Sequence, residues 1–221
     1  MKANALIFDM DGTLYQFDKG AAETFGRSAF GRQIGDNVQA LFRQQFGLDA
    51  AAAAAMFQDL DRRFAGEISL GLEREHGIPR SDYFAATWNL DPRQFMERDA
   101  ALTAALESVT VRRALLSAAP QIWIDRVLGL LELREAFNPH IFNGEPDIRK
   151  PNPEAFLQVA KALDVPPEQI VAIGDQEHTD ILPARAAGMR TLLIGTAQSA
   201  ADFTAPDAVS AIKLLTNEGI I

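Results

Sequence analysis

The stretch that decides the fold is "FDMDGTLY", which runs from Phe8 to Tyr15. A short apolar run, residues 6–8, leads into it and predicts a buried strand. Asp9 and Asp11 then lie at the carboxyl end of that strand. Two carboxylates this close repel each other and resist burial as a pair. The stretch therefore predicts a site that supplies compensating positive charge.

Strands and helices alternate in the second half of the chain. Apolar runs predict strands at residues 111–116, 141–142, 170–173 and 191–194. Helical patterns between and after them cover residues 122–131, 153–163, 181–187 and 209–217. This alternation predicts a parallel sheet with both faces covered by helices.

Residues 17–107 have a helical pattern instead. Val38, Leu41 and Phe42 recur at helical spacing, and Asp49 is expected to be the N-cap of a helix that starts with the alanine run 50–55. The predicted fold class is therefore α/β. Residues 1–16 and 108–221 form a Rossmann-like parallel-sheet core, and residues 17–107 form an inserted α-helical domain.

Composition narrows the classes of function. The 221 residues carry a formal net charge of −9, which disfavours binding to nucleic acid polymers and to anionic membranes. The chain has no cysteine, so thiolate catalysis and disulfides are excluded. The apolar run near the N-terminus is too short for a signal peptide, and no stretch approaches the length of a membrane span. A cytoplasmic location is expected, and the oligomeric state is not predicted.

Several polar residues follow predicted strands, where ligands bind in open parallel sheets. They are Asp9, Asp11, Ser117, Lys150, Asp175 and Asp180. Asp9 and Asp175 together suit a hard divalent cation, and Mg²⁺ is the expected cofactor. The metal ion and Lys150 would compensate the carboxylates. The side chain of Asp11 is then free to move a proton.

Four motifs occur in a fixed order: Asp-x-Asp-Gly-Thr, a serine after a strand, Lys-Pro, and Gly-Asp-x₄-Asp. Together they resemble the motifs of the haloacid dehalogenase (HAD) superfamily of phosphohydrolases, and the helical insertion resembles that superfamily's inserted cap. "GEISLGLEREHGI" (residues 66–78), "DYFAATW" (residues 82–88) and the tyrosine of the opening stretch resemble the pyrimidine 5′-nucleotidase-like branch.

The resemblance implies a role for each matching residue. Asp9 would be the nucleophile that forms an aspartyl-phosphate. Asp11 would be the general acid–base, with its backbone carbonyl as a metal ligand. Asp9 and Asp175 would be metal ligands through their side chains. Asp180 would brace a metal-bound water.

Other matching residues would bind the phosphoryl group. The hydroxyl of Ser117 would donate to a phosphoryl oxygen, and Lys150 would neutralise charge on the equatorial oxygens. Gly12 and Thr13 would contribute to phosphate binding, because a glycine turn lets backbone N–H groups approach closely.

The chain departs from the branch pattern in three ways. Glu67 and Ile68 stand where threonines are usual, and Thr87-Trp88 stands where Val-His is usual. Ala118-Ala119 follows Ser117 where Asn-Ala or Asn-Gly is usual. Glu67, Ile68 and Trp88 are therefore the candidate residues for substrate choice in the cap.

The leading interpretation is a Mg²⁺-dependent phosphomonoester hydrolase for a small phosphorylated metabolite, and a nucleoside 5′-monophosphate is one candidate. A phosphoglucomutase-like phosphotransferase remains an alternative, because the core motifs do not separate it from a hydrolase. A 2-haloacid dehalogenase is disfavoured by Asp11, since a halide leaving group needs no proton. A non-catalytic binding module is disfavoured because Asp9 and Lys150 are both present.

Overall fold

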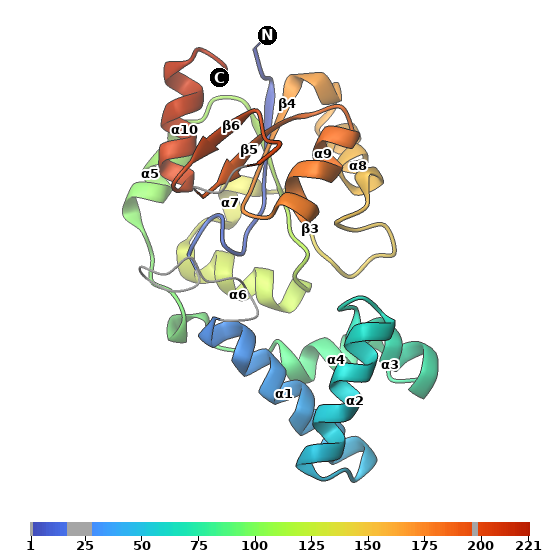
Figure 1. Ribbon diagram of the computed structural model, residues 1–221. Helices are drawn as coiled ribbons and strands as arrows, with labels where there is room; N and C mark the ends of the chain where they lie inside the picture. Colours follow the sequence, from blue (N-terminus) through green and yellow to red (C-terminus); the bar gives the residue numbers. More distant parts are fainter. Residues whose placement is uncertain (1, 17–27, 196–198) are drawn as a thin grey trace. The chain divides into compact units, whose positions relative to one another are not determined.

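The computed structural model describes residues 2–16, 28–195 and 199–221, and it forms two compact units (Figure 1). The sheet unit comprises Met1–Gln16 and Met96–Ile221, and the helical unit comprises Phe17–Phe95. The expected start of the insertion, residue 17, lies outside the described residues.

The sheet unit is built on a parallel sheet, as the sequence predicts. Its strands in the described residues are β1 (Ala5–Phe8), β2 (Arg112–Leu116), β3 (Ile141–Phe142), β4 (Ile170–Gly174), β5 (Arg190–Ile194) and β6 (Phe203–Ala205). They are arranged in the order β3-β2-β1-β4-β5-β6, with every neighbouring pair parallel. The α/β fold class is confirmed. The short strand β6 was not predicted.

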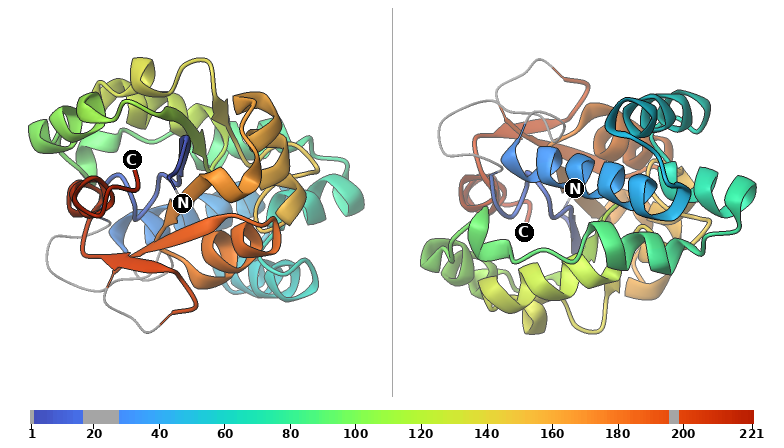
Figure 2. Two further views of the ribbon diagram at one scale, coloured as in Figure 1. Left: turned by 90° about the horizontal axis from the view of Figure 1, so that it is seen from above. Right: turned by 90° about the horizontal axis from the view of Figure 1, so that it is seen from below.

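Helices cover both faces of this sheet (Figure 1; Figure 2, left). They are α5 (Ala100–Ser108), α6 (Gln121–Leu131), α7 (Arg134–Phe137), α8 (Pro153–Leu163), α9 (Leu182–Ala186) and α10 (Ala208–Asn217). The central strand β1 shows why both faces need cover. Ala5 and Ile7 join the core cluster that includes Phe156 of α8. Phe8 points to the other face and meets Phe137 of α7 edge to face, with ring centroids 5.8 Å apart. A strand buried on both faces is expected to be continuously apolar, as β1 is.

The second boundary between the units differs from the sequence prediction. Helix α5 packs against α10 and belongs to the sheet unit, although its residues up to 107 were expected in the insertion. Its buried side chains are Leu102 and Leu106. Helical periodicity shows that a helix has an apolar face, but it does not show which neighbour covers that face.

The helical unit contains α1 (Ala29–Phe46), α2 (Ala50–Arg63), α3 (Ile68–His76) and α4 (Arg80–Thr87). Helix α1 packs against α2 and α4, and α3 also contacts both of these helices. Two helices begin with side-chain caps. Ser28 accepts a hydrogen bond from the N–H of Gly31, and Asp49 accepts one from the N–H of Ala52 at 2.8 Å. The expected N-cap at Asp49 is therefore confirmed.

Candidate active site

The loop after β1 turns Asp9 and Asp11 toward the neighbouring strand ends. The N–H of Asp9 donates to the carbonyl of Ile173 at 2.9 Å, which ties Asp9 to the end of β4. The carbonyl of Met10 accepts from the N–H of Leu14 at 2.9 Å and closes a tight turn. Gly12 has a φ of +86° within this turn, a conformation that side chains with a Cβ rarely adopt. The Asp-x-Asp-Gly sequence thus forms a tight turn that places both carboxylates at the carboxyl end of β1.

Lys150 joins two of the predicted aspartates. Its Nζ lies 2.5 Å from Oδ1 of Asp9 and 2.6 Å from Oδ1 of Asp180. The side chains of Lys150, Asp9 and Asp180 are 2%, 9% and 6% exposed. Water therefore screens these ion pairs only weakly. Residues far apart in the sequence meet here because the parallel strands β1, β3 and β4 all end at the same edge of the sheet. Asp9 follows β1, Lys150 lies in the segment after β3, and Asp180 lies in the segment after β4.

Asp180 reaches the cluster through a wide π-helical turn, Glu177–Ile181. Its Oδ2 accepts a hydrogen bond from the N–H of Gln176 at 3.0 Å. A Cβ atom at Gly174 would lie 2.4 Å from both Cβ and Cγ of Asp180. Only glycine fits at that position, which explains physically why Gly174 precedes the two aspartates of the Gly-Asp-x₄-Asp motif.

Asp9, Asp175 and Asp180 offer ligand atoms that all lie within 4.8 Å of one another. Oδ1 of Asp175 is buried and has no hydrogen-bond partner among the described residues. A buried carboxylate oxygen without a donor is costly unless a ligand satisfies it. Carboxylate oxygens are the ligands that hard divalent cations prefer. The residues present therefore fit a divalent metal ion. Both oxygens of Asp180 already accept hydrogen bonds, so Asp9 and Asp175 are the better placed ligands.

The electrostatics of the cluster agree with this. Burial, together with the neighbouring carboxylates, raises the pKa of Asp9 above its ordinary value, and the charge of Lys150 only partly offsets this effect. Burial is also the main cause that raises the pKa of Asp175, followed by the charges of Asp9 and Asp180. One ammonium group faces several carboxylates, so negative charge remains in excess. A bound cation would relieve it.

Asp11 lies in a different environment, held by three side chains. Its Oδ1 accepts hydrogen bonds from the hydroxyl of Tyr15 and from Nε1 of Trp123, the latter at 2.8 Å. The hydroxyl of Ser117 lies 3.4 Å from Oδ2. Burial raises the pKa of Asp11, and the hydrogen bonds from Tyr15 and Trp123 partly oppose that shift. Asp11 is thus coupled to hydrogen-bond donors, whereas Asp9 is coupled to a cation.

Sequence reasoning did not find Tyr15 and Trp123 as site residues. Trp123 is fully buried. No sequence spacing links it to Asp11, which lies over a hundred positions earlier. Tyr15 had a weak signal in the sequence, because it lies only four positions after Asp11 in the same short stretch. In the structure the two residues form an isolated bridge.

The predicted phosphate-binding residues surround these aspartates. Ser117 is buried directly after β2, and its hydroxyl oxygen also accepts a hydrogen bond from the N–H of Ala119 at 3.0 Å. Oγ1 of Thr13 is buried without a hydrogen-bond partner among the residues that the structure describes. Gly12 lies between Asp11 and Thr13 in the turn. Their role in binding phosphate stays a prediction.

The predicted specificity residues belong to the helical unit. Glu67 is the residue before α3, and Ile68, the first residue of that helix, is buried. Trp88 follows α4 and packs edge to face on Phe30, with ring centroids 5.6 Å apart. Ile68 and Trp88 therefore contribute to packing. An effect of any of the three on substrate choice stays a prediction.

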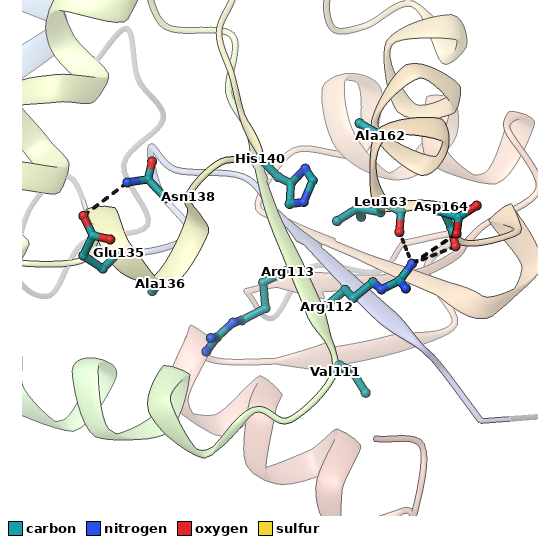
Figure 3. A pocket seen from close by; sticks show the side chains of 10 residues that line it. All are labelled: Val111, Arg112, Arg113, Glu135, Ala136, Asn138, His140, Ala162, Leu163 and Asp164. Carbon is teal, nitrogen blue, oxygen red and sulfur yellow. Dashed lines mark hydrogen bonds and ion pairs between the residues drawn. The ribbon is translucent and has the colours of Figure 1, made fainter.

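A cavity of about 430 Å³ lies at the opposite end of β2 (Figure 3). Val111, Arg112 and Arg113 line it at the amino end of the strand, whereas Ser117 follows the carboxyl end. The guanidinium of Arg112 donates to the carbonyls of Leu163 and Asp164, and that of Arg113 donates to the carbonyl of Leu106. Both guanidinium groups are thus hydrogen-bonded to backbone carbonyls of the protein itself. The carboxylate cluster, not this cavity, is the candidate active site.

Comparisons with known proteins identify the family. The chain matches the haloacid dehalogenase-like hydrolase family over residues 3–188. It is 26% identical to a phosphoserine phosphatase of Thermus thermophilus, with 86% of this chain and 87% of the relative covered. It is 38% identical to a glyceraldehyde 3-phosphate phosphatase of Methanopyrus kandleri over 64 residues, which span 29% of this chain and only 28% of that relative.

Structural comparison gives the same class of fold. The crystal structure of a HAD phosphatase from Thermococcus onnurineus has a TM-score of 0.69 and 18% sequence identity, with 97% of this chain and 98% of that chain covered. The fold and the family match together define a hydrolase of the HAD type. The chain belongs to the haloacid dehalogenase-like hydrolase family. In the described ranges, no helix is long and apolar enough to cross a membrane.

Proposed function

We propose that this chain is a Mg²⁺-dependent phosphomonoester hydrolase that acts on a small phosphorylated metabolite. The observation that carries the proposal is the buried cluster in which Lys150 joins Asp9 and Asp180 beside the unpaired oxygen of Asp175. The family match and the phosphatase relatives support phosphomonoester hydrolysis as the reaction.

Asp9 is the proposed nucleophile. One of its carboxylate oxygens bonds to phosphorus while the bond to the ester oxygen breaks, which splits hydrolysis into two easier steps. Asp11 gives a proton to the departing alcohol, and afterwards takes a proton from the water that attacks the aspartyl-phosphate. Separate environments suit the two roles, because Asp9 lies against an ammonium group and Asp11 against neutral donors.

The remaining residues hold charge in place. Lys150 keeps Asp9 oriented and stabilises negative charge on the transferring phosphoryl group. Ser117, Gly12 and Thr13 would bind the phosphoryl oxygens. Asp9, Asp175 and the backbone carbonyl of Asp11 would hold Mg²⁺, with Asp180 as their support. When bound, Mg²⁺ would neutralise negative charge that develops on the phosphoryl oxygens.

The substrate class is a narrower proposal. The segments at residues 66–78 and 82–88 favour a nucleotidase-like branch and hence a nucleoside 5′-monophosphate. The relatives named above act by their names on glyceraldehyde 3-phosphate and phosphoserine, so a non-nucleotide phosphate is the main competitor. The helical unit is proposed to act as a cap that selects among these substrates, with Glu67, Ile68 and Trp88 as its candidate determinants.

A phosphate-release screen tests the proposal. Purified protein is incubated with nucleoside monophosphates, sugar phosphates, phosphoglycolate, phosphoserine and glyceraldehyde 3-phosphate, each with Mg²⁺ and with EDTA. We expect phosphate release that EDTA abolishes and that Asp9→Asn lacks. Halide release without metal would instead indicate a dehalogenase, and transfer within a sugar phosphate without free phosphate would indicate a phosphotransferase. If the protein turned over none of these substrates, the result would favour a non-catalytic binding module.

A further inference from the structure

Two aromatic side chains converge on one oxygen of Asp11. The hydroxyl of Tyr15 and Nε1 of Trp123 both donate to Oδ1, whereas Oδ2 lies toward the hydroxyl of Ser117 at 3.4 Å. We propose that Tyr15 and Trp123 are positioning residues that fix Oδ1 of Asp11, so that Oδ2 carries the transferred proton. The inference rests on the proposed function, because it concerns the acid–base group of that reaction.

The chemistry of the donors assigns the two oxygens. An indole nitrogen can only donate, so the direction of the bond from Trp123 is fixed. A carboxyl oxygen offers about two lone-pair positions, and Oδ1 of Asp11 already accepts two donors. A proton on Asp11 therefore belongs on Oδ2. That oxygen faces Ser117, the residue proposed to bind the phosphoryl group.

Burial makes these two contacts strong. Trp123 is 0% exposed and Tyr15 is 7% exposed, so water competes little for their donor groups. Trp123 lies in the first turn of α6, and Tyr15 closes the turn that contains Asp11. The carboxylate is thus held between a packed helix and its own loop. Such support is what keeps an acid–base group in a productive geometry.

The proton balance follows directly. In the first step, an oxygen of Asp9 bonds to phosphorus, the bond from phosphorus to the ester oxygen breaks, and the proton of Oδ2 moves to that oxygen. In the second step, water bonds to phosphorus, the bond to Asp9 breaks, and one water proton returns to Oδ2. Oδ1 of Asp11 takes no proton in either step. Tyr15 and Trp123 stabilise the carboxylate formed by the first transfer.

This role predicts a dependence on the leaving group. An alcohol must receive a proton as it departs, whereas p-nitrophenolate is stable without one. The value of kcat/KM reports the first irreversible step, in which the leaving group departs. Loss of a positioning residue should therefore slow an alkyl phosphate far more than p-nitrophenyl phosphate.

The experiment measures kcat/KM of Tyr15→Phe and Trp123→Phe on the best alkyl phosphate and on p-nitrophenyl phosphate. We expect each variant to lose on the order of tenfold on the alkyl phosphate, the worth of one hydrogen bond to a charged group. On p-nitrophenyl phosphate, which needs little general acid catalysis, we expect a change of less than about threefold. Thr191→Val is the control, because it removes a buried hydroxyl that donates to Asp202 near the amino end of β5, away from the carboxyl edge of the sheet, and should keep the wild-type ratio.

A double-mutant cycle separates positioning from packing. In an Asp11→Asn background, Tyr15→Phe should cause no further loss, because the residue acts through Asp11. Tyr15→Phe removes a single atom and carries the test if Trp123→Phe does not fold.

Equal loss on both substrates, or additive loss in the double mutant, would overturn the inference and leave a structural role. Unchanged or faster turnover of the alkyl phosphate would overturn it too, because the two bonds would then hold Asp11 away from its task. Wild-type protein that released no phosphate at all would overturn the proposed function together with this inference.

Discussion

Replacing Lys150 with methionine removes the cation at the centre of the site with little change in length. Two ion pairs disappear, the 2.5 Å pair with Asp9 and the 2.6 Å pair with Asp180. Both carboxylates stay buried at the edge of the sheet. Breaking a buried ion pair from one side typically costs about 3–5 kcal/mol, since it leaves an uncompensated charge. We expect Lys150→Met to lower the free energy of unfolding of the metal-free protein by that amount near pH 8.

The loss should be smaller in acid, and the sign follows from the pKa shifts. Burial lowers the pKa of Lys150, but the charges of Asp180 and Asp9 outweigh it and raise the pKa. The ammonium therefore stays charged below the unfolded value of 10.5, so its own titration adds no pH dependence between pH 5 and 9. The pKa of Asp9 is raised, so the folded state binds more protons and stability falls as pH rises through that shift. Without Lys150 the free energy of unfolding should fall more steeply as the pH rises. In acid the loss is smaller, because the buried carboxyl groups are protonated and no longer carry an unpaired charge.

Urea unfolding in EDTA, at pH 5.5 and pH 8, measures the effect. Lys161→Met is the matched control, since Lys161 is an exposed lysine of α8 and should change stability by less than about 0.5 kcal/mol. Adding Asp180→Asn to Lys150→Met should recover part of the loss by removing one unpaired charge. If Lys150→Met were as stable as Lys161→Met at pH 8, the claim that Lys150 forms buried, stabilising ion pairs with Asp9 and Asp180 would be wrong.

Asp9→Asn should abolish phosphate release yet keep a wild-type circular dichroism spectrum, because the amide is nearly isosteric but a poor nucleophile; near-wild-type turnover would exclude Asp9 as the nucleophile. Mg²⁺ should raise the melting temperature more near pH 8 than near pH 6, because burial raises the pKa of Asp175 and protons compete with the metal ion. Asp175→Asn should lose this stabilisation by Mg²⁺. If the variant kept it unchanged, the metal ion would bind elsewhere. Glu67→Thr and Trp88→His should change relative kcat/KM among phosphomonoesters by about 1–3 kcal/mol and leave p-nitrophenyl phosphate close to wild type. Uniform loss on every substrate would instead indicate that these two residues support the helical unit.

The sequence predicted the parallel sheet and the polar residues at its carboxyl edge well, because both have local signals. A continuous apolar run identified β1, and the spacing of Asp9 and Asp11 followed from the turn that Gly12 permits. The Gly-Asp-x₄-Asp motif also has a local cause, since Gly174 leaves space for the returning Asp180.

Features that depend on tertiary packing were missed or misplaced. Strand β6 has a threonine between its two apolar residues, so it lacks the run of consecutive apolar residues that predicted the even shorter strand β3. The boundary of the insertion was placed beyond α5, because the choice of α10 as its neighbour is a long-range contact. Trp123 reads as an ordinary core residue, since its indole N–H finds Asp11 only when α6 packs beside the loop after β1.

Phosphorylation of Asp9 itself tests the central claim most directly. Protein mixed with a good substrate and Mg²⁺ is quenched rapidly and treated with borohydride, which reduces an aspartyl-phosphate to homoserine. Mass spectrometry of the peptide that contains Asp9 then identifies the modified residue. We expect homoserine at position 9 with substrate and Mg²⁺, and an unchanged aspartate when EDTA is present. Turnover of the same substrate with no modification at Asp9 at any quench time, or with the modification on another aspartate, would contradict the proposed mechanism.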